Sequence, residues 1–211
     1  MSYFSFSDCE TGTVKLMVST TQENNVIIGH NSLSPITKNY VNCSILGSNV
    51  NCTGSNQVQL GNSKTNLYST SGLQQTSDGR DKVQIRDSNI GLNFISRLRP
   101  VDYKWNFRSD YKIATPEYEM FNGVKIPIVE ILTNDGSKTR SRYHHGLIAQ
   151  EVKQVMTDMN IDFGGYQDHS INGGDDQLTI SYIELIAPMI KAIQELKAKV
   201  DALKLKIILK E

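Results

Sequence analysis

The sequence has no excess of either charge, few cysteines and no long apolar run. Its 211 residues include 22 basic and 22 acidic side chains, so no broad basic surface is expected that would attract nucleic acid or an anionic membrane. No apolar run approaches the ~18 residues that cross a bilayer, and residues 1–4 lack the pattern of a secretory signal. We therefore expect no nucleic-acid partner and no membrane segment, in a chain long enough to bury a real core.

Cysteine provides no framework for the fold. The three cysteines, Cys9, Cys43 and Cys52, all lie in the first quarter of the chain. An odd, unevenly spread set is not the pattern of a disulfide-stapled domain, so we expect Cys43 and Cys52 to be reduced and packed. The sequence has no CxxC pair that would suggest zinc and no glycine-rich phosphate loop. We therefore expect neither a metal nor a cofactor.

Residues 22–76 are rich in Asn, Ser, Thr and Gly and contain almost no charge. Three segments share one pattern, in which an asparagine leads into a short apolar stretch that ends at a glycine: 25–29, 42–47 and 56–61. The three glycines are unevenly spaced, so the repeat is irregular, and one such unit is too small to bury a face alone. We therefore predict stacked β-rungs, a triple β-helix or β-prism stalk, rather than a disordered linker. Residues 1–21 are expected to be its upstream end.

From residue 77 onward the sequence becomes charged, aromatic and helix-forming. Ser88 is placed to cap a helix that Arg99-Pro100 ends. The turn Asn134-Asp135-Gly136 predicts a hairpin between strands 126–133 and 139–143. The remaining expected elements are a strand at 101–105, a helix at 147–156, a polar loop at 164–176 and a short strand at 178–180. Together these elements predict an α+β domain.

The C-terminal segment has the strongest periodicity in the chain. Its apolar residues follow a 4-3-4-3 spacing, a heptad seam sustained over more than three heptads. After Tyr182, the predicted trimer seam consists of Ile186, Met189, Ile193, Leu196, Val200, Leu203 and Ile207. We expect a long coiled-coil-like helix that joins three copies; the alternative is one amphipathic helix packed on its own domain. Pro188 is expected to kink this helix or to mark where its continuous part starts.

A serine and a lysine lie five residues apart where the two halves meet, in Ser77-Asp78-Gly79-Arg80-Asp81-Lys82. Taken alone, this segment is typical of a turn with a surface lysine. Together with residues 90–105, 146–152 and 192–203 in the same order, it resembles the C-terminal intramolecular chaperone domain of phage tailspikes and tail fibres, the endosialidase type. A related domain occurs in the eukaryotic myelin regulatory factor. The resemblance implies a homotrimer that folds the β-stalk before it and then cuts itself off.

The resemblance assigns the nucleophile to Ser77 and its base to Lys82, the Ser-Lys dyad of a self-cleaving serine peptidase. A serine hydroxyl attacks well only when a base removes its proton. A lysine acts as that base only when burial or a nearby positive charge lowers its pKa. Arg80 would supply such a charge, and assembly would supply the burial. Asp78 and Asp81 act against this effect unless an arginine pairs with them.

The scissile bond is expected on one side of Ser77 or the other. Attack on the Thr76 carbonyl passes through an unstrained five-membered ring, whereas attack by Ser77 on its own carbonyl would need a strained four-membered ring. Cleavage before Asp78 would therefore need a serine from another chain, or a water molecule activated by the dyad. The sequence leaves both bonds open, so the candidate cleavage residues are Thr76, Ser77 and Asp78.

Two other polar clusters invite a catalytic interpretation. His144 and His145 follow Arg140 with no carboxylate or cysteine at ligand spacing, and adjacent strand residues face opposite ways, so a structural role is favoured. His145 is retained as a supporting residue that could contact the dyad or the stalk. The acidic stretch 168–176 lacks the spacing of a calcium loop and is expected to be a plain loop.

We therefore divide the chain into the end of a fibre stalk at 1–76 and an intramolecular chaperone with autocleavage at 77–211. The expected partners are further copies of the chain and its own stalk. The expected location is the host cytoplasm during assembly, with the stalk retained in the virion as tail fibre or spike. A non-cleaving structural tip with a receptor-binding role is the main alternative. A hydrolase for external substrates has little support, because Ser77 and Lys82 form the only apparent catalytic pair.

Overall fold

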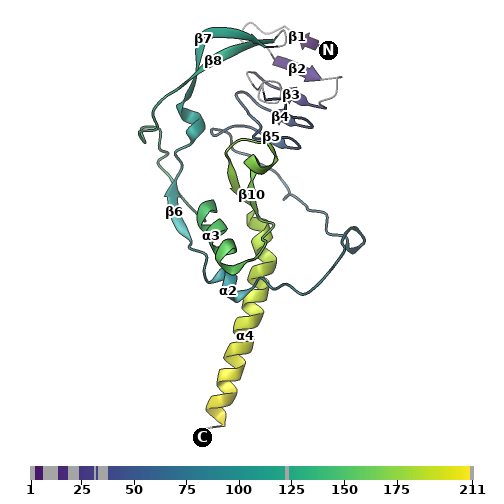
Figure 1. The fold of residues 1–211 in the computed structure, drawn as a ribbon, viewed down its shortest axis with the longest axis vertical. Helices are drawn as coiled ribbons and strands as arrows, with labels where there is room; N and C mark the ends of the chain where they lie inside the picture. Colours follow the sequence, from purple (N-terminus) through teal and green to yellow (C-terminus); the bar gives the residue numbers. More distant parts are fainter. Residues whose placement is uncertain are drawn as a thin grey trace. The chain divides into compact units, whose positions relative to one another are not determined.

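The computed structural model describes residues 3–6, 14–18, 24–30, 32, 38–121 and 124–209. The chain, coloured along its sequence in Figure 1, divides into two compact units. The first consists of Met1–Thr70, Lys104–Tyr143 and His169–Gln177, and the second of Ser71–Tyr103, His144–Asp168 and Leu178–Glu211. Two segments from beyond residue 77 thus belong to the unit that contains the N-terminal strands. The predicted division at 76/77, between the end of a stalk and a chaperone, stays a prediction.

A five-stranded sheet organises the first unit. In spatial order its strands are β1 (Tyr3–Phe6), β2 (Val14–Val18), β3 (Val26–Ile28), β4 (Ser44–Leu46) and β5 (Val58–Leu60). β1, β2 and β3 pair antiparallel, whereas β3, β4 and β5 stack in parallel (Figure 1). Ile27 pairs with Ile45, and Ile45 with Gln59, and the same offsets separate the three glycines that end the repeats. The expected repeat is therefore confirmed as stacked rungs of one chain, and β1 and β2 extend the same sheet.

Asparagine forms the corners of this rung stack, by which we mean β3, β4, β5 and their connecting turns. Asn24, Asn42 and Asn56 precede the three strands with left-handed φ angles of 48°, 56° and 60°, a conformation that asparagine adopts more readily than most residues. The Asn42 side chain donates to Asn56 Oδ1 at 2.9 Å. Asn25 Oδ1 accepts the backbone N–H of Cys43, also at 2.9 Å. The Asn-rich composition therefore reflects turn geometry and hydrogen bonds between rungs.

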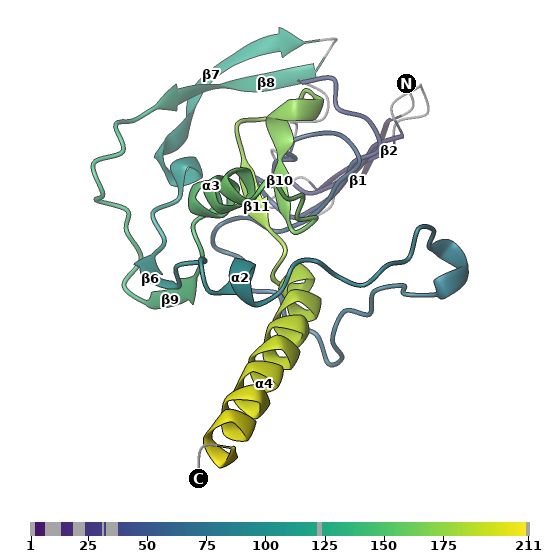
Figure 2. The same cartoon turned by 60° about the horizontal axis from the view of Figure 1, so that its bottom comes forward.

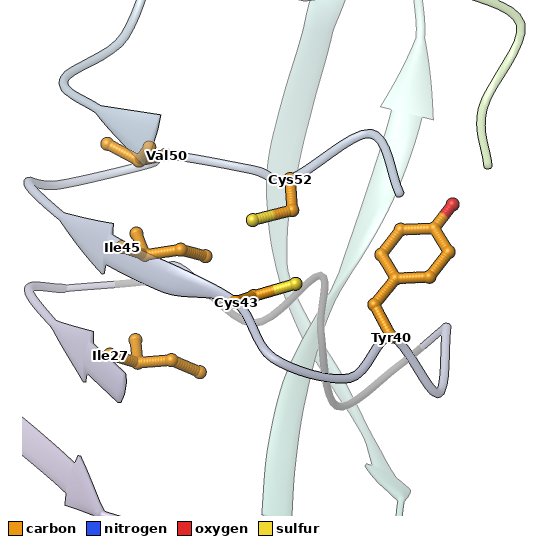
Figure 3. Close-up of a cluster of buried hydrophobic side chains, with 6 residues drawn as sticks. All are labelled: Ile27, Tyr40, Cys43, Ile45, Val50 and Cys52. Carbon is orange, nitrogen blue, oxygen red and sulfur yellow. The ribbon is translucent and has the colours of Figure 1, made fainter. Parts of the chain in front are cut away.

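Six buried side chains fill the interior of the rung stack (Figure 3): Ile27, Tyr40, Cys43, Ile45, Val50 and Cys52. Cys43 and Cys52 are fully buried and not joined by a disulfide, which confirms the expectation of packed, reduced thiols. Burial raises the pKa of the Cys52 thiol to about 12, and the adjacent Cys43 adds to the shift. Cys9 lies outside the described residues.

The outer face of the three parallel strands is also apolar, but it is exposed. Successive residues of a strand point to opposite faces, so the neighbours of the buried Ile27 and Ile45 project outward. The exposed fractions are 40% for Val26, 37% for Ile28, 53% for Leu46, 71% for Val58 and 49% for Leu60. A contiguous exposed apolar surface of this kind marks an interaction site.

The first unit also contains η2 (Arg108–Tyr111), η3 (His169–Asn172) and an antiparallel pair made of β7 (Lys112–Phe121) and β8 (Val124–Ile131). The predicted hairpin between strands 126–133 and 139–143 is wrong, because β8 pairs with the strand before it. The asparagine turn closes locally instead. Thr139 donates its N–H to the Gly136 carbonyl at 3.1 Å, and its hydroxyl donates to the same oxygen at 2.7 Å.

The second unit is α+β. Its elements lie wholly or mostly within it: η1 (Gly79–Asp81), α2 (Leu92–Ile95), β6 (Val101–Lys104), β9 (Tyr143–Gly146), α3 (Ala149–Met159), β10 (Tyr166–Asp168), β11 (Leu178–Ile180), η4 (Tyr182–Leu185) and α4 (Ile186–Ile208). β6 pairs with β9, and β10 with β11. Phe94, Val152, Phe163 and Leu185 form its core, with the two phenyl rings 5.2 Å apart.

Most elements expected in the second half form, with shifted bounds. The helix expected to start at the Ser88 cap starts later, because α2 begins only at Leu92. Ser88 Oγ instead accepts the N–H of Ile90 in a local turn. The expected polar loop at 164–176 also contains regular structure, β10 and η3. The elements that are confirmed are the strand at 101–105, the helix at 147–156, the strand at 178–180 and the long C-terminal helix.

α4 is a single long helix (Figure 2). Pro188 lies in its first turn, where a backbone N–H has no partner within the helix, so the proline marks the start and introduces no break. The seam is exposed in the single chain, at 67% for Ile193, 51% for Leu196 and 59% for Leu203. None of the helices in the described part of the chain is long and apolar enough to cross a membrane.

Replacement of Gly29 tests the corner of the rung stack. Gly29 has a φ of 148°, and an added Cβ would lie 1.8 Å from the Gly47 carbonyl oxygen. We expect Gly29→Ala to lower the free energy of unfolding by about 2 kcal/mol or more, measured by urea denaturation with Trp105 fluorescence, since Trp105 belongs to the same unit. Gly72→Ala is the control, because its Cβ would meet no atom within 4 Å. Equal effects of the two changes would contradict the stacked corner.

The buried thiol predicts a loss of stability in alkali. Because the folded state holds the Cys52 proton up to a pKa of about 12, whereas an unfolded thiol releases it near ~8.5, the folded state binds more protons above that pH. Its free energy of unfolding should therefore fall by about 1–2 kcal/mol between pH 8 and pH 10. Urea titrations at both values check this, and Cys52→Ala should show a flatter dependence. Stability unchanged up to pH 10 would contradict the shift.

Candidate functional site

Ser77 and Lys82 come together through one turn. Asp78 caps the short helix η1 by accepting the N–H of Arg80 at 2.9 Å, and Lys82 donates its N–H to the Gly79 carbonyl at 3.2 Å. The turn brings the Lys82 Nζ to 2.6 Å from the Ser77 Oγ and to 3.4 Å from the Ser77 carbonyl oxygen. The pair expected from the sequence is thus within hydrogen-bonding distance.

One of the two acids beside this pair, Asp78, is paired within the turn. Arg80 Nη2 lies 2.6 Å from Asp78 Oδ2, and Arg80 Nε donates to both carboxylate oxygens at 3.1 Å. Hydrogen bonds from the Arg80 side chain and then from its backbone lower the pKa of Asp78. The same contact raises the pKa of Arg80. Asp78 is therefore neutralised by Arg80 and not by Lys82, which is the condition that the dyad requires.

The pair is open to solvent in the single chain. Ser77, Lys82 and all residues from 79 to 89 are exposed, and an added Cβ at Gly79 would meet nothing within 4 Å. The Lys82 ammonium donates to the serine hydroxyl, which orients the two groups. General-base action needs the neutral amine, which desolvation favours. The geometry therefore supplies positioning, and a change of surroundings would have to supply activation.

His145 makes its side-chain contact on the strand pair β6–β9. It belongs to β9, and its Nδ1 is 2.6 Å from Asp102 Oδ1 on β6, with both side chains exposed. The neighbouring His144 ring stacks on Tyr103 with centroids 6.0 Å apart. These contacts agree with a structural role for both histidines. A supporting role for His145 beside the dyad stays a prediction.

Two of the motif segments of the second half, 90–105 and 146–152, contact α4 or the turn before it. The Leu92 N–H donates to Glu195 Oε2 at 2.8 Å, and Gly91 leaves room for that carboxylate, because an added Cβ would lie 2.8 Å from it. The Tyr182 hydroxyl accepts the Leu147 N–H at 2.9 Å. Glu195 was missed by sequence reasoning, since nothing in a heptad pattern singles out one exposed acid.

The segment His169–Gln177, expected as a plain loop, makes directed contacts in the first unit. The Asp175 carboxylate accepts hydrogen bonds from Tyr40 and Lys38, and His169 contacts Thr53. In the described part of the chain, no cluster of three or more His, Cys, Asp or Glu side chains has the geometry of a metal site. No sequence signal pointed to these partners, which are far apart in the chain.

One comparison with known proteins matches a segment that begins at Ser77. The family model described as the chaperone of endosialidase, a peptidase family, matches residues 77–161, so its first matched residue is Ser77. "Myelin gene regulatory factor-like A" of Dictyostelium discoideum is 26% identical over 146 residues, which are 67% of this chain and 13% of that protein. The chain thus spans a small part of that relative. Residues 77–161 of this chain are therefore similar to the chaperone-of-endosialidase family.

Proposed function

We propose that this chain is an intramolecular chaperone that trimerises, folds the β-stalk of a viral fibre or tailspike, and then cuts itself at Ser77. The observation that carries the proposal is the 2.6 Å contact between Ser77 Oγ and Lys82 Nζ, at the first residue of the segment that matches a chaperone and peptidase family. A stack of β-rungs lies directly before it in the chain. The client is therefore residues 1–76, and the chaperone is 77–211.

Two exposed apolar surfaces support self-association. One is the outer face of β3, β4 and β5, where Val58 is 71% exposed, and the other is the α4 seam, where Ile193 is 67% exposed. Burial of apolar surface contributes roughly 25 cal/mol per Å², so copies of the chain gain stability by covering each surface with its own counterpart. Closed cyclic symmetry lets every copy make the same contacts, and mixed β-branched and leucine seams permit trimers.

A trimerising chaperone answers a kinetic problem of the stalk. Bringing the exposed β-faces of three separate chains together must overcome the entropy of aligning distant segments, which makes such folding slow. A C-terminal trimer holds three stalk ends at high local concentration and fixes their register. Scission afterwards removes the covalent link to the chaperone, so the assembled stalk is kinetically trapped.

Cleavage would use Ser77 as the nucleophile on the Thr76 carbonyl. Neutral Lys82 Nζ accepts the hydroxyl proton as Oγ attacks, and returns it to the departing Ser77 nitrogen, which leaves an ester between Thr76 and the serine oxygen. Water then hydrolyses this ester to a Thr76 carboxylate and a free Ser77. Scission before Asp78 by a serine of another copy, or by an activated water, remains the second route. Because Lys82 is exposed in the single chain, activation awaits burial on assembly.

The remaining assignments follow from this proposal. The partners are copies of the same chain and its own stalk, without a cofactor. Folding and scission take place in the host cytoplasm, and the stalk remains in the virion. The solvent exposure of Lys82 favours one alternative, a non-cleaving structural tip with a receptor-binding role.

Intact-mass measurement of the denatured protein tests the dyad. We expect two fragments in the wild type that meet at Thr76/Ser77 or Ser77/Asp78, and a single unbroken chain in Ser77→Ala and in Lys82→Ala, because each change removes the nucleophile or its base. Ser71→Ala and Lys64→Ala are the controls and should cleave as the wild type does. An unbroken wild-type chain would leave the structural tip as the better description, and fragments in all variants would remove the dyad.

Sedimentation equilibrium tests the α4 seam. Leu196, on the seam, is 51% exposed in the single chain. Leu196→Asp would place a charge in the buried seam of a trimer, and we expect it to weaken association by at least ~100-fold, since burying an unpaired charge costs several kcal/mol. Lys199→Asp, off the seam, should leave the trimer intact. A monomeric wild type, or trimers that withstand Leu196→Asp, would contradict this assignment.

A further inference from the structure

The segment His169–Gln177 lies after the proposed cleavage bond, yet it belongs to the same compact unit as the rung stack before that bond. It contacts the turns that follow β3 and β4, from Lys38 and Tyr40 to Thr53 and Gln57. We call this segment the clamp. Scission at Ser77 would therefore cut the covalent link between two pieces that remain packed together.

Asp175 is the charged part of the clamp. Its carboxylate accepts a hydrogen bond from the Tyr40 hydroxyl at 2.7 Å and another from the Lys38 ammonium. Its backbone N–H donates to the Thr53 carbonyl at 2.6 Å. Tyr40 is 5% exposed, and its hydroxyl points away from the apolar cluster (Figure 3), so the contact is a hydrogen bond to a charged group at the edge of a core.

The charge of Asp175 agrees with this geometry. Burial acts to raise the pKa of Asp175, but the hydrogen bonds from Lys38 and Tyr40 outweigh it, and the pKa lies below its usual value. Burial, and then the hydrogen bond to Asp175, raise the pKa of Tyr40 to about 12. The carboxylate is therefore ionised and the phenol protonated at neutral pH, which is the pairing that the contact needs.

His169 and Gly174 make the clamp specific for one turn of the rung stack. The Thr53 N–H donates to Gln57 Oε1 at 2.9 Å, which orients the amide so that Gln57 Nε2 faces His169 Nδ1 at 3.1 Å. His169 Nδ1 therefore accepts, and the Thr53 hydroxyl lies 2.6 Å from it. Gly174 packs so closely that an added Cβ would lie 2.4 Å from the Thr53 carbonyl oxygen. The clamp therefore contacts the backbone of this turn as well as its side chains.

We propose that His169–Gln177 is a clamp that keeps the stalk fragment bound to the chaperone fragment after the chain is cut, so that scission and release are separate steps. The scission step rests on the proposed function; the clamp contacts do not. A further contact across the cut is the hydrogen bond from Ser63 to Asp110, at 2.6 Å, where Asp110 is also paired with Arg140. The partner recognised is the folded rung stack, because Tyr40 and Thr53 come together only when the rungs have stacked.

An induced nick tests the clamp without using the dyad. A full-length Ser77→Ala chain with an N-terminal tag receives a site-specific protease sequence after Gly72, within the exposed run 64–77. After nicking, the tagged fragment is immobilised, and release of the C-terminal fragment is followed over time. We expect slow release with an unaltered clamp and release at least ~10-fold faster in Asp175→Ala, because a hydrogen-bonded charge is lost.

Two further variants isolate the effect. Tyr40→Phe removes only the hydroxyl that donates to Asp175 and keeps the buried ring, so it should also release faster. Asp176→Ala is the matched control, because its carboxylate is 90% exposed and pairs with Arg108 of the same fragment at 3.3 Å. It should release as the unaltered clamp does.

Each outcome bears on one claim. Immediate separation of the fragments after the nick would overturn retention. Retention that is equally slow in Asp175→Ala, Tyr40→Phe and Asp176→Ala would overturn the assignment of the clamp. Absence of self-cleavage in the parent chain would count against the proposed function alone, since the nick does not depend on Ser77.

Discussion

The structure depends on one constraint, which is that a strand as short as β3, β4 or β5 buries too little surface to be stable alone. Parallel stacking of the three strands meets this constraint on one face, where Ile27 and Ile45 are 2% exposed. The other face of the same strands stays apolar and exposed. In a single chain, such a sheet leaves one apolar face open to solvent. Under the proposed function, further copies of the chain would cover this face, and a device that aligns those copies would then have an evident purpose.

The candidate dyad also depends on two separate factors, the local turn that positions the two side chains and the surroundings that would activate them. One turn, capped by Asp78, sets the distance between Ser77 Oγ and Lys82 Nζ without help from the rest of the fold. Reactivity is a different matter, because a lysine in water holds its proton. If the pair is buried only in the trimer, scission reports that assembly has occurred. An exposed pair in the single chain is compatible with such a gated reaction.

The sequence predicted features that repeat or that close within one turn. The register of the parallel strands could be read because successive rungs reuse the same corner, and Gly29, Gly47 and Gly61 mark it. Pairings set by tertiary packing were not predicted. The turn at Asn134 suggested a hairpin, yet β8 pairs with the preceding β7. Tyr40 and Asp175 are far apart in the chain, and neither residue type identifies the other from the sequence.

The first unit contains segments from before and after the proposed cleavage bond, and this arrangement would separate the cut from the release. If residues before and after the cleavage bond met only through the covalent chain, hydrolysis and release would be one event. Here the folded rung stack offers Tyr40 and Thr53 to a segment from beyond the bond, and an unfolded stalk offers neither in the right place. Under the proposed function, the clamp would therefore bind a correctly stacked stalk fragment more tightly than a misfolded one. A chaperone that held its client in this way would sense completion through the client's own structure, and the proposed cut would then make the folded state hard to reverse.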